Sequence, residues 1–309
     1  MPLRALIAVL VLGVFASQAR AADRVGYAEA FNVLYSVNLD ARSATQIGAA
    51  GPIYGQPSGN IEGLTFSPSG VLYAVNDASA IKTLLTIDKN TGLATPVGIL
   101  NLSGTKTSSQ LDLGLSFTCD GRLWMSSRYG DLWRIDPVDA SASLIGNIGV
   151  AVTGLAARNN QLFGAGSQGN NNFYSIDTAN AQASLLGGYG SSNYITTASP
   201  GFDSAGQLWA ILAYVPPQPG TTQIADWSDL AIIDQHTGAL SKLGNIVGPP
   251  ELKENFFSDL KGLAIAAPVC TAAAVPFAIP IFDARGIIAL VLAMLLAGGV
   301  RLRHCRPAR

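Results

Sequence analysis

A fifteen-residue pattern recurs five times along the chain and constrains the fold more than any other feature. One copy, Leu84–Gly98, reads LLTIDKNTGLATPVG: an apolar run, an Asp, a Thr-Gly turn, a short second run and a closing glycine. This order is typical of a β-hairpin. The other copies have Val or Ile fourth, Asp or Asn fifth and Gly last, and they are Leu34–Gly48, Leu132–Gly146, Phe173–Gly187 and Leu230–Gly244.

A second pair of apolar runs precedes four of these hairpins. Its fullest form is Gly63–Val75, GLTFSPSGVLYAV, in which a Ser-Pro-Ser-Gly turn separates two predicted strands. Related segments begin at Gly114, Gly154 and Ser199, and each continues through a polar turn into Leu and an aromatic residue. Four short strands that recur roughly every 40 to 57 residues predict the blades of a β-propeller.

The two ends of the repeat region complement each other. The hairpin 34–48 lacks the preceding inner strand, whereas Gly262–Ile265 is such a strand with no hairpin after it. We expect the C-terminal strand to complete the first blade, because this leaves no open sheet edge where the ring closes. Four full units and one composite unit predict five blades and an all-β fold. A sixth blade could be contained in the longer connections, 49–62, 99–113 or 245–261.

Residues 1–21 have the three parts of a secretory signal. Arg4 precedes an apolar core, Ala5–Ala16, and Ala19–Ala21 is a small-x-small cleavage site. The alternative is a membrane anchor, but twelve apolar residues span only about 18 Å of a bilayer about 30 Å thick. We expect cleavage, so that the mature protein begins near Ala22 and resides outside the cytoplasm.

The character of the chain changes after the predicted propeller, 22–265. Residues 266–278 form an uncharged, Pro-containing linker, and residues 279–309 contain the apolar run Ile287–Val300 and an Arg-rich tail. The positive-inside rule places this tail in the cytoplasm and the propeller on the other side of the membrane. The fifteen residues from Gly286 to Val300 are a short span, about 22 Å long.

The last thirty residues resemble the IPTL/PEP-type C-terminal sorting signals of Gram-negative bacteria. Ile279, Pro280 and Gly286 match the common spacing of that motif, whereas Phe282 and Arg285 stand where Leu and Trp are usual. The resemblance implies an exosortase-like membrane protease as a partner. It also implies a cut near the motif and release of the passenger or its transfer to the cell surface. The alternative is a plain single-pass anchor in the inner membrane.

The hairpins also resemble those of a group of exported bacterial propellers with the repeat L-Y-x-I-D-x-x-T-G-x-A-x-x-I-G. That group is loosely related to lactonase-like and surface-layer propellers. The resemblance covers most of the mature chain, and it implies the fold and an exported location without an assigned activity.

The low charge and the low histidine content argue against several classes of function. A formal net charge of -1, with 13% charged residues, argues against a nucleic-acid partner. Only two histidines occur, His236 in a hairpin turn and His304 in the tail, so the propeller has no His-based triad or His-rich metal site. The motif GAGSQG at 164–169 leads into a strand, whereas a dinucleotide-binding loop opens a helix.

Oxygen ligands suggest a possible Ca²⁺ site. Glu62 directly precedes the first-strand Gly63, as in calcium-dependent lactonases and esterases of the gluconolactonase type, which this position resembles. Asn76 follows the next strand, and Asp112 lies two residues before Gly114. Carboxylate and amide oxygens suit a hard cation. The residues that precede the matching glycine in other blades do not form a ring of ligands; they are Leu113, Thr153 and Lys261.

The Asp of the hairpin recurs in every full blade, which predicts a structural role. An Asp side chain can accept hydrogen bonds from backbone N–H groups of the turn that follows it. A catalytic residue would be expected once. These residues are Asp88, Asp136, Asp177 and Asp234.

Two of the three cysteines lie in the exported part of the chain. Cys119 falls in a turn of the third blade and Cys270 just beyond the last strand, so outside the cytoplasm they could form a disulfide. The alternative is two free structural thiols. Cys305 lies in the cytoplasmic tail.

The sequence thus predicts an exported, surface-sorted propeller that acts as a non-catalytic binding or envelope-matrix module. Its partner would be a protein or glycan that contacts loops, since binding residues concentrate there. The polar or Pro-containing loops are Ser167–Asn172, Gly188–Thr197 and Tyr214–Trp227. The alternative is a calcium-dependent, lactonase- or esterase-like hydrolase with Glu62 and Asp112 in the central channel.

Overall fold

The computed structural model describes residues 24–77, 81–191, 194–214, 228–248, 259–268 and 270. The predicted signal segment (1–21) and sorting segment (279–309, with Ile279, Pro280 and Gly286) lie outside the described residues, as does most of the predicted linker. Within the described ranges there is no helix, and therefore none of the length and hydropathy needed to cross a membrane.

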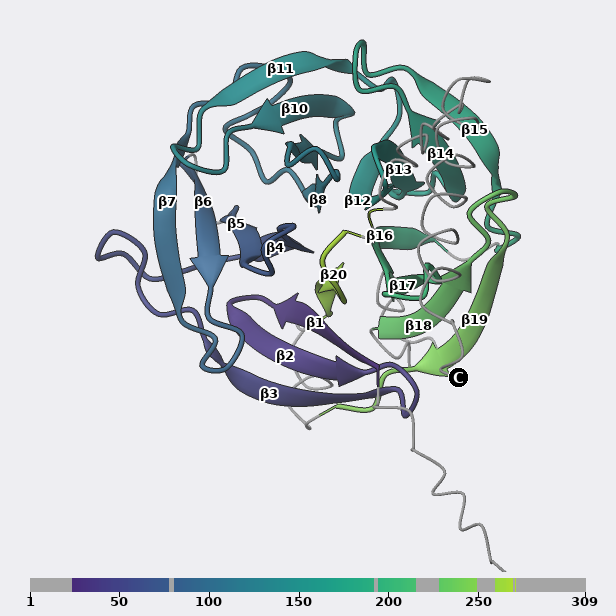
Figure 1. The fold of residues 1–309 in the computed structure, drawn as a ribbon, viewed down its shortest axis with the longest axis horizontal. Coiled ribbons are helices and arrows are strands. Elements are labelled where there is room, and N and C mark those ends of the chain that lie inside the picture. Colours follow the sequence, from purple (N-terminus) through teal and green to yellow (C-terminus); the bar gives the residue numbers. More distant parts are fainter. Residues whose placement is uncertain are drawn as a thin grey trace, which may run out of the picture. The chain divides into compact units, whose positions relative to one another are not determined.

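Five antiparallel sheets of four strands form a propeller (Figure 1). Blade 2 consists of β4 (Ile61–Phe66), β5 (Leu72–Asn76), β6 (Lys82–Ile87) and β7 (Ala94–Leu100). Blade 3 consists of β8 (Gly114–Phe117), β9 (Leu123–Ser126), β10 (Asp131–Ile135) and β11 (Ala142–Asn147). Blade 4 consists of β12 (Val152–Arg158), β13 (Gln161–Gly166), β14 (Asn172–Ile176) and β15 (Ala183–Gly188). Blade 5 consists of β16 (Ile195–Phe202), β17 (Leu208–Tyr214), β18 (Ser228–Ile233) and β19 (Leu240–Asn245).

Blade 1 is built from both ends of the propeller. The C-terminal strand β20 (Lys261–Ala264) joins β1 (Val25–Ala30), β2 (Val33–Asn38) and β3 (Ser43–Ala49). Figure 1 shows the yellow-green β20 beside the purple β1 near the centre of the ring. The predicted closure and the count of five blades are confirmed. The connection 49–62 holds only an isolated bridge between Ile53 and Gln56, and 99–113 holds no further strand.

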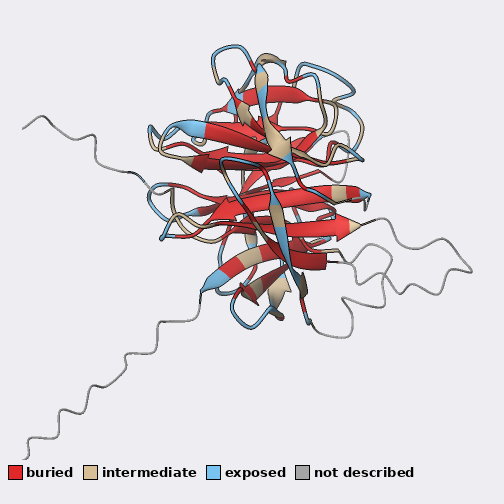
Figure 2. Ribbon diagram, turned by 90° about the vertical axis from the view of Figure 1, so that its right-hand side faces the viewer, coloured by how far each residue is buried: buried red, intermediate tan, exposed pale blue. Residues whose placement is uncertain are grey.

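Burial explains the difference between the two strand pairs seen in the sequence. Every residue of β4, an inner strand, is buried, because neighbouring blades cover it on both sides. The outer strand β11 has no buried residue. Figure 2 shows the buried residues concentrated in the strands and the exposed ones at their ends and in the loops. Continuous apolar runs therefore mark inner strands, and mixed composition marks outer ones.

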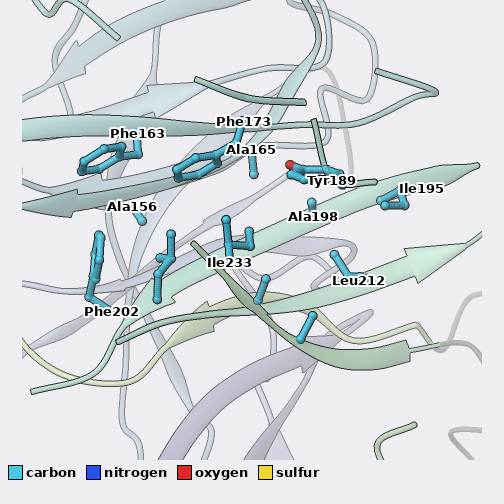
Figure 3. Close-up of a cluster of buried hydrophobic side chains, with 13 residues drawn as sticks. Ala156, Phe163, Ala165, Phe173, Tyr189, Ile195, Ala198, Phe202, Leu212 and Ile233 are labelled. Carbon is cyan, nitrogen blue, oxygen red and sulfur yellow. The ribbon is translucent and has the colours of Figure 1, made fainter. Parts of the chain in front are cut away.

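Aromatic side chains fill the space between blades 4 and 5 (Figure 3). The rings of Phe163 and Phe173 stack with centroids 5.6 Å apart, and Phe202 of blade 5 meets Phe163 edge-on at 5.9 Å. The buried Tyr189 keeps its hydroxyl satisfied by donating to the Gly166 carbonyl at 3.2 Å. Rings in these geometries stabilise the contact beyond the area that they bury.

The closing glycine of each hairpin lies against the turn of the next blade. A Cβ on Gly48 would lie 2.2 Å from the Thr91 carbonyl oxygen, and one on Gly187 only 1.8 Å from that of Thr237. A Cβ on Gly98 would lie 2.8 Å from the Asp139 carbonyl oxygen and one on Gly146 3.1 Å from that of Asn180, whereas one on Gly244 would meet the Arg42 guanidinium. The closing glycine is therefore the point at which one blade contacts the next, and a side chain at Gly48, Gly98 or Gly187 would push the blades apart.

The hairpin Asp residues have the structural role that their recurrence predicts. The Asp88 Oδ1 atom accepts a hydrogen bond from the Asn90 backbone N–H at 2.8 Å, and Asp136 accepts one from Val138 at 2.8 Å. Asp177 and Asp234 make the same contact with the residue two positions on. Each side chain thus satisfies a backbone donor in its own turn.

We predict that Gly187→Ala lowers the free energy of unfolding by about 3 kcal/mol, because the new methyl group overlaps the Thr237 carbonyl. Gly188→Ala is the matched control: the residue is exposed, and its nearest neighbour is the side chain of Asn172 at 3.3 Å. Urea unfolding followed by circular dichroism measures both variants. Equal effects of the two substitutions would contradict the close packing of blades 4 and 5 at this glycine.

Candidate functional site

The topology separates two faces of the ring. The turns between first and second strands and between third and fourth strands lie on one face, which we call the turn face. The connections between second and third strands and from blade to blade lie on the other, the connection face. The loop 167–172 and the connection 188–197 belong to the connection face, and the predicted loop Tyr214–Trp227 begins there at the end of β17.

The centre of the ring is nearly filled. The innermost strands leave a cavity of about 10 Å³ between residues such as Gly63, Gly114 and Gly262. A buried site needs roughly this volume for a single water molecule. Towards the turn face, residues 265–268 line a cavity of about 30 Å³ together with inner-strand residues of the other blades. The centre therefore holds no ligand-sized space between the described residues.

A cluster of charged side chains lies where β20 and β4 begin, on the connection face. Glu62 is 1% exposed, and its Oε1 atom lies 2.9 Å from the Lys261 ammonium. The Leu113 backbone N–H donates to the Oε2 atom at 2.8 Å, and the Asn60 amide donates to Oε1. The structure thus joins blades 1 and 2 through an ion pair at the two positions that precede the inner-strand glycines.

Asp112 reaches the same ammonium from the connection that leads into blade 3. Its Oδ1 atom lies 3.6 Å from the Lys261 Nζ atom, and its Oδ2 atom accepts a hydrogen bond from the Arg128 guanidinium at 2.9 Å. The φ of Asp112 is 44°, in the left-handed region that non-glycine residues seldom adopt. The surrounding contacts therefore hold this carboxylate against a backbone preference.

A second buried ion pair positions Asp112. The Lys82 ammonium lies 2.6 Å from the Asp77 carboxylate, and neither side chain is more than 2% exposed. The Asp77 Oδ2 atom accepts the backbone N–H groups of Leu111 at 2.7 Å and Asp112 at 3.3 Å. Asp77 thus supports the segment that presents Asp112.

Burial and neighbouring charges shift the pKa values of Glu62 and Lys261. Burial raises the pKa of Glu62 from 4.5 to about 7, although the Lys261 ammonium acts in the opposite direction. Burial alone would lower the pKa of Lys261, but the surrounding carboxylates, Glu62 first and then Asp259 and Asp112, outweigh it and raise the pKa. Lys261 therefore stays protonated, and Glu62 is the group that titrates near neutral pH.

These residues do not fit a calcium site. The Glu62 and Asp112 carboxylates both lie close to the Lys261 ammonium, where a divalent cation would meet a like charge. The Asn76 side-chain oxygen accepts the Gly59 N–H at 3.3 Å and so holds the loop before β4. In the part of the chain that the structure describes, no group of three His, Cys, Asp or Glu residues could hold a metal ion.

The basic side chains of this cluster were not predicted from the sequence. Lys261 was noted only as a break in a ring of ligands, yet it occupies the same strand position as Glu62 in the adjacent blade, which is a signal for pairing. Lys82 opens a strand whose other residues are mostly apolar, and such a charge usually requires a buried partner. Arg128 lies in a turn and gave no comparable signal.

Three exposed aromatic side chains lie in separate connections of the connection face. Phe31, Tyr54 and Tyr194 are 48%, 57% and 49% exposed, and each belongs to a connection on this face. Phe31 and Tyr54 also have φ values of 60° and 50°, which are unfavourable for bulky residues. No aromatic side chain among the described residues of the turn face is exposed to this degree.

No protein-family model matches the chain, and no curated protein matches it in sequence. Several solved structures are similar to the chain at low sequence identity. A Bacteroides thetaiotaomicron protein of unknown function has 16% identity and a TM-score of 0.44, over 60% of this chain and 53% of that one. This chain thus spans about half the length of that protein.

Two further structures have similar scores. A nidogen/laminin complex has 10% identity and a TM-score of 0.46, over 79% of this chain and 99% of that one. A putative gluconolactonase has 17% identity and a TM-score of 0.42, over 74% and 80%. At these values we draw no conclusion from them about activity or ligand.

We predict that the melting temperature falls as the pH rises from 5 to 8, and that Glu62→Gln reduces this fall. The folded state holds the Glu62 proton up to a pH of about 7, whereas the unfolded chain releases it near 4.5. The stabilisation is therefore complete below pH 4.5 and is lost between these two values. Asp40→Asn is the control, because Arg24 lowers the pKa of that exposed carboxyl. An unchanged slope in Glu62→Gln would contradict the assignment.

Proposed function

We propose that this protein is an exported binding module whose connection face contacts a surface protein or glycan. The observation that carries the proposal is the confinement of the exposed aromatic residues Phe31, Tyr54 and Tyr194 to that face. Aromatic side chains are enriched at binding interfaces and account for much of their energy. Two of the three also adopt unfavourable backbone conformations, a form of strain that clusters at functional sites.

The charged cluster supports binding over catalysis. Glu62 pairs with Lys261, Asp77 with Lys82, and Asp112 with Arg128. Each carboxylate also has a backbone or side-chain donor or a second cation within reach. Groups that are satisfied in this way shape and stiffen the face, and they have little capacity left for a metal or an attacking water.

Two features support export. The sequence of residues 1–21 resembles a secretory signal, and the Cys119–Cys270 disulfide joins residues 151 positions apart. Disulfides of this kind persist outside the cytoplasm. With the motif Ile279, Pro280 and Gly286, these features support a path through the inner membrane to an exosortase-like protease and then to the surface.

The binding face is tested with Phe31→Asn, Tyr54→Asn and Tyr194→Ala in one protein. Asn tolerates positive φ, so the first two changes remove the rings without straining the backbone. We predict at least a tenfold loss of binding to outer-envelope preparations of the source organism, measured by co-sedimentation, with an unchanged melting temperature. The matched control replaces the exposed turn-face residues Val71, Leu93 and Val138 with Ala.

Full binding by the aromatic variant, or equal loss in the turn-face control, would exclude the connection face as the binding surface. Envelopes treated beforehand with protease or with periodate identify the ligand. Loss of binding after protease indicates a protein, and loss after periodate indicates a glycan.

A hydrolase remains the second candidate, because Glu62 titrates near neutral pH as a general base should and lies close to Asp112 through Lys261. Since Lys261 stands between the carboxylates, we predict that millimolar Ca²⁺ or a chelator leaves the melting temperature unchanged. We also predict that lactones are not hydrolysed. Calcium-dependent lactone hydrolysis that is lost in Glu62→Gln would instead establish the enzyme.

Processing is tested by intact mass on protein from the native envelope, with and without reductant. We predict loss of residues 1–21 and a cut near Ile279–Gly286, which would support sorting and release. Retention of Arg309 would instead indicate a protein anchored in the inner membrane. Reduction should add two daltons for the Cys119–Cys270 bond, and no gain would mean that the native protein lacks it.

A further inference from the structure

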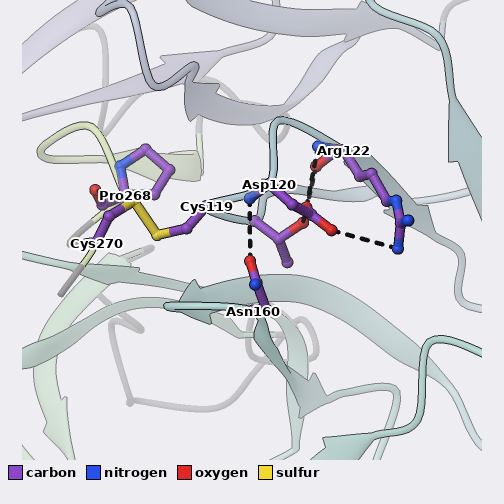
Figure 4. Close-up of a disulfide and its surroundings, with 7 residues drawn as sticks. Cys119, Asp120, Arg122, Asn160, Pro268 and Cys270 are labelled. Carbon is purple, nitrogen blue, oxygen red and sulfur yellow. Dashed lines mark hydrogen bonds and ion pairs between the residues drawn. A yellow bond between two sulfur atoms is a disulfide. The ribbon is translucent and has the colours of Figure 1, made fainter. Parts of the chain in front are cut away.

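The ring-closing strand β20 is tied at both of its ends to the two flanks of β8. At the connection face, Lys261 opens β20 and lies 3.6 Å from Asp112, two residues before β8. At the turn face, the chain leaving β20 reaches Cys270, which is bonded to Cys119, two residues after β8 (Figure 4). Blade 1 is thereby joined to blade 3 at both faces of the ring.

The sheet itself holds β20 weakly. The strand has four residues, and its ladder with β1 consists of two residue pairs, Tyr27 with Ala264 and Glu29 with Lys261, with an irregular register between them. Two serine hydroxyls of blade 5 add single hydrogen bonds, from Leu260 to Ser228 and from Gly262 to Ser199, at 2.8 and 2.9 Å. A strand with so few bonds opens easily unless other contacts retain it.

The Cys119 end of the disulfide is firmly held. The Cys119 backbone N–H donates to the Asn159 carbonyl at 2.9 Å, and the Asp120 N–H donates to the Asn160 side chain at 3.0 Å. Figure 4 shows the Asn160 bond and the Arg122 contacts of Asp120 within the same turn. Through these bonds the disulfide attaches the end of blade 1 to blade 4 as well as to blade 3.

We propose that the Cys119–Cys270 bond and the Lys261 ion pairs form a latch that keeps β20 in the ring independently of the chain beyond Cys270. Tension applied to the chain beyond Cys270 is then transmitted to blade 3 and not to β20. Cleavage beyond Cys270 likewise leaves β20 in the ring. The two ties act on opposite ends of one strand, so each limits the opening that loss of the other permits. The latch does not depend on what the connection face binds.

Hydrogen exchange of the folded, full-length protein tests the latch. The variants are Cys119→Ser with Cys270→Ser, Lys261→Met, and all three changes together. We expect about thirtyfold faster exchange in peptides from β1 and β20 when the disulfide is removed, and less than threefold in β13 and β14 of blade 4. Lys261→Met should accelerate β20 much more without the disulfide than with it.

Lys242→Met is the matched control, because Lys242 forms its ion pair with Asp229 inside blade 5. If the cysteine variant does not fold, mild reduction of folded wild-type protein gives the same comparison. Equally faster hydrogen exchange in all five blades would mean that the disulfide stabilises the whole propeller and not β20 in particular, and it would overturn the latch. Unchanged β20 exchange in every variant would overturn it too.

Discussion

The propeller depends on how closely neighbouring blades approach each other. At the rim, Gly48 and Gly187 lie against the carbonyl groups of the next hairpin turn. At the centre, a Cβ on Gly154 would lie 1.9 Å from the Ala198 carbonyl oxygen, and one on Gly262 would lie 2.8 Å from the Leu64 nitrogen. Only glycine permits such contact without displacing a strand. Two rings of glycines, one inner and one outer, therefore set the spacing that the aromatic side chains between blades then fill.

The repeats made the fold predictable, because a four-strand unit that cannot bury its own faces requires neighbours of the same kind. Five blades, the composite first blade and the hairpin Asp turns all followed from the spacing of residues, whereas the Cys119–Cys270 bond was one of two alternatives that the sequence left open. The candidate site was predicted only in part. Glu62 and Asp112 were identified by their position before an inner-strand glycine, but Lys261, which contacts both, lies in another blade.

The contacts of Lys261 with Glu62 and Asp112 depend on how the blades are placed against each other, which the repeat pattern does not specify. Lys261 meets Glu62 only because the last strand enters the ring beside β4, and Arg128 reaches Asp112 across a turn. Glu29 illustrates the same limit: it is opposite Lys261 in the β1–β20 ladder, yet its carboxyl has no hydrogen-bond partner among the described residues, and burial raises its pKa well above the ordinary value. A buried carboxyl of this kind leaves no trace in a sequence pattern.

The composite blade also determines when the ring can be completed. Tyr27 and Ala264 pair across more than 230 residues, so the sheet of blade 1 is incomplete until β20 has been added. Bringing such distant segments together carries a large loop-closure entropy and makes folding slow. Blades 2 to 5 consist of consecutive strands and can each form before β20 is added, while β1 keeps an unpaired edge until then. Completion of the fold thus depends on the addition of β20 to blade 1.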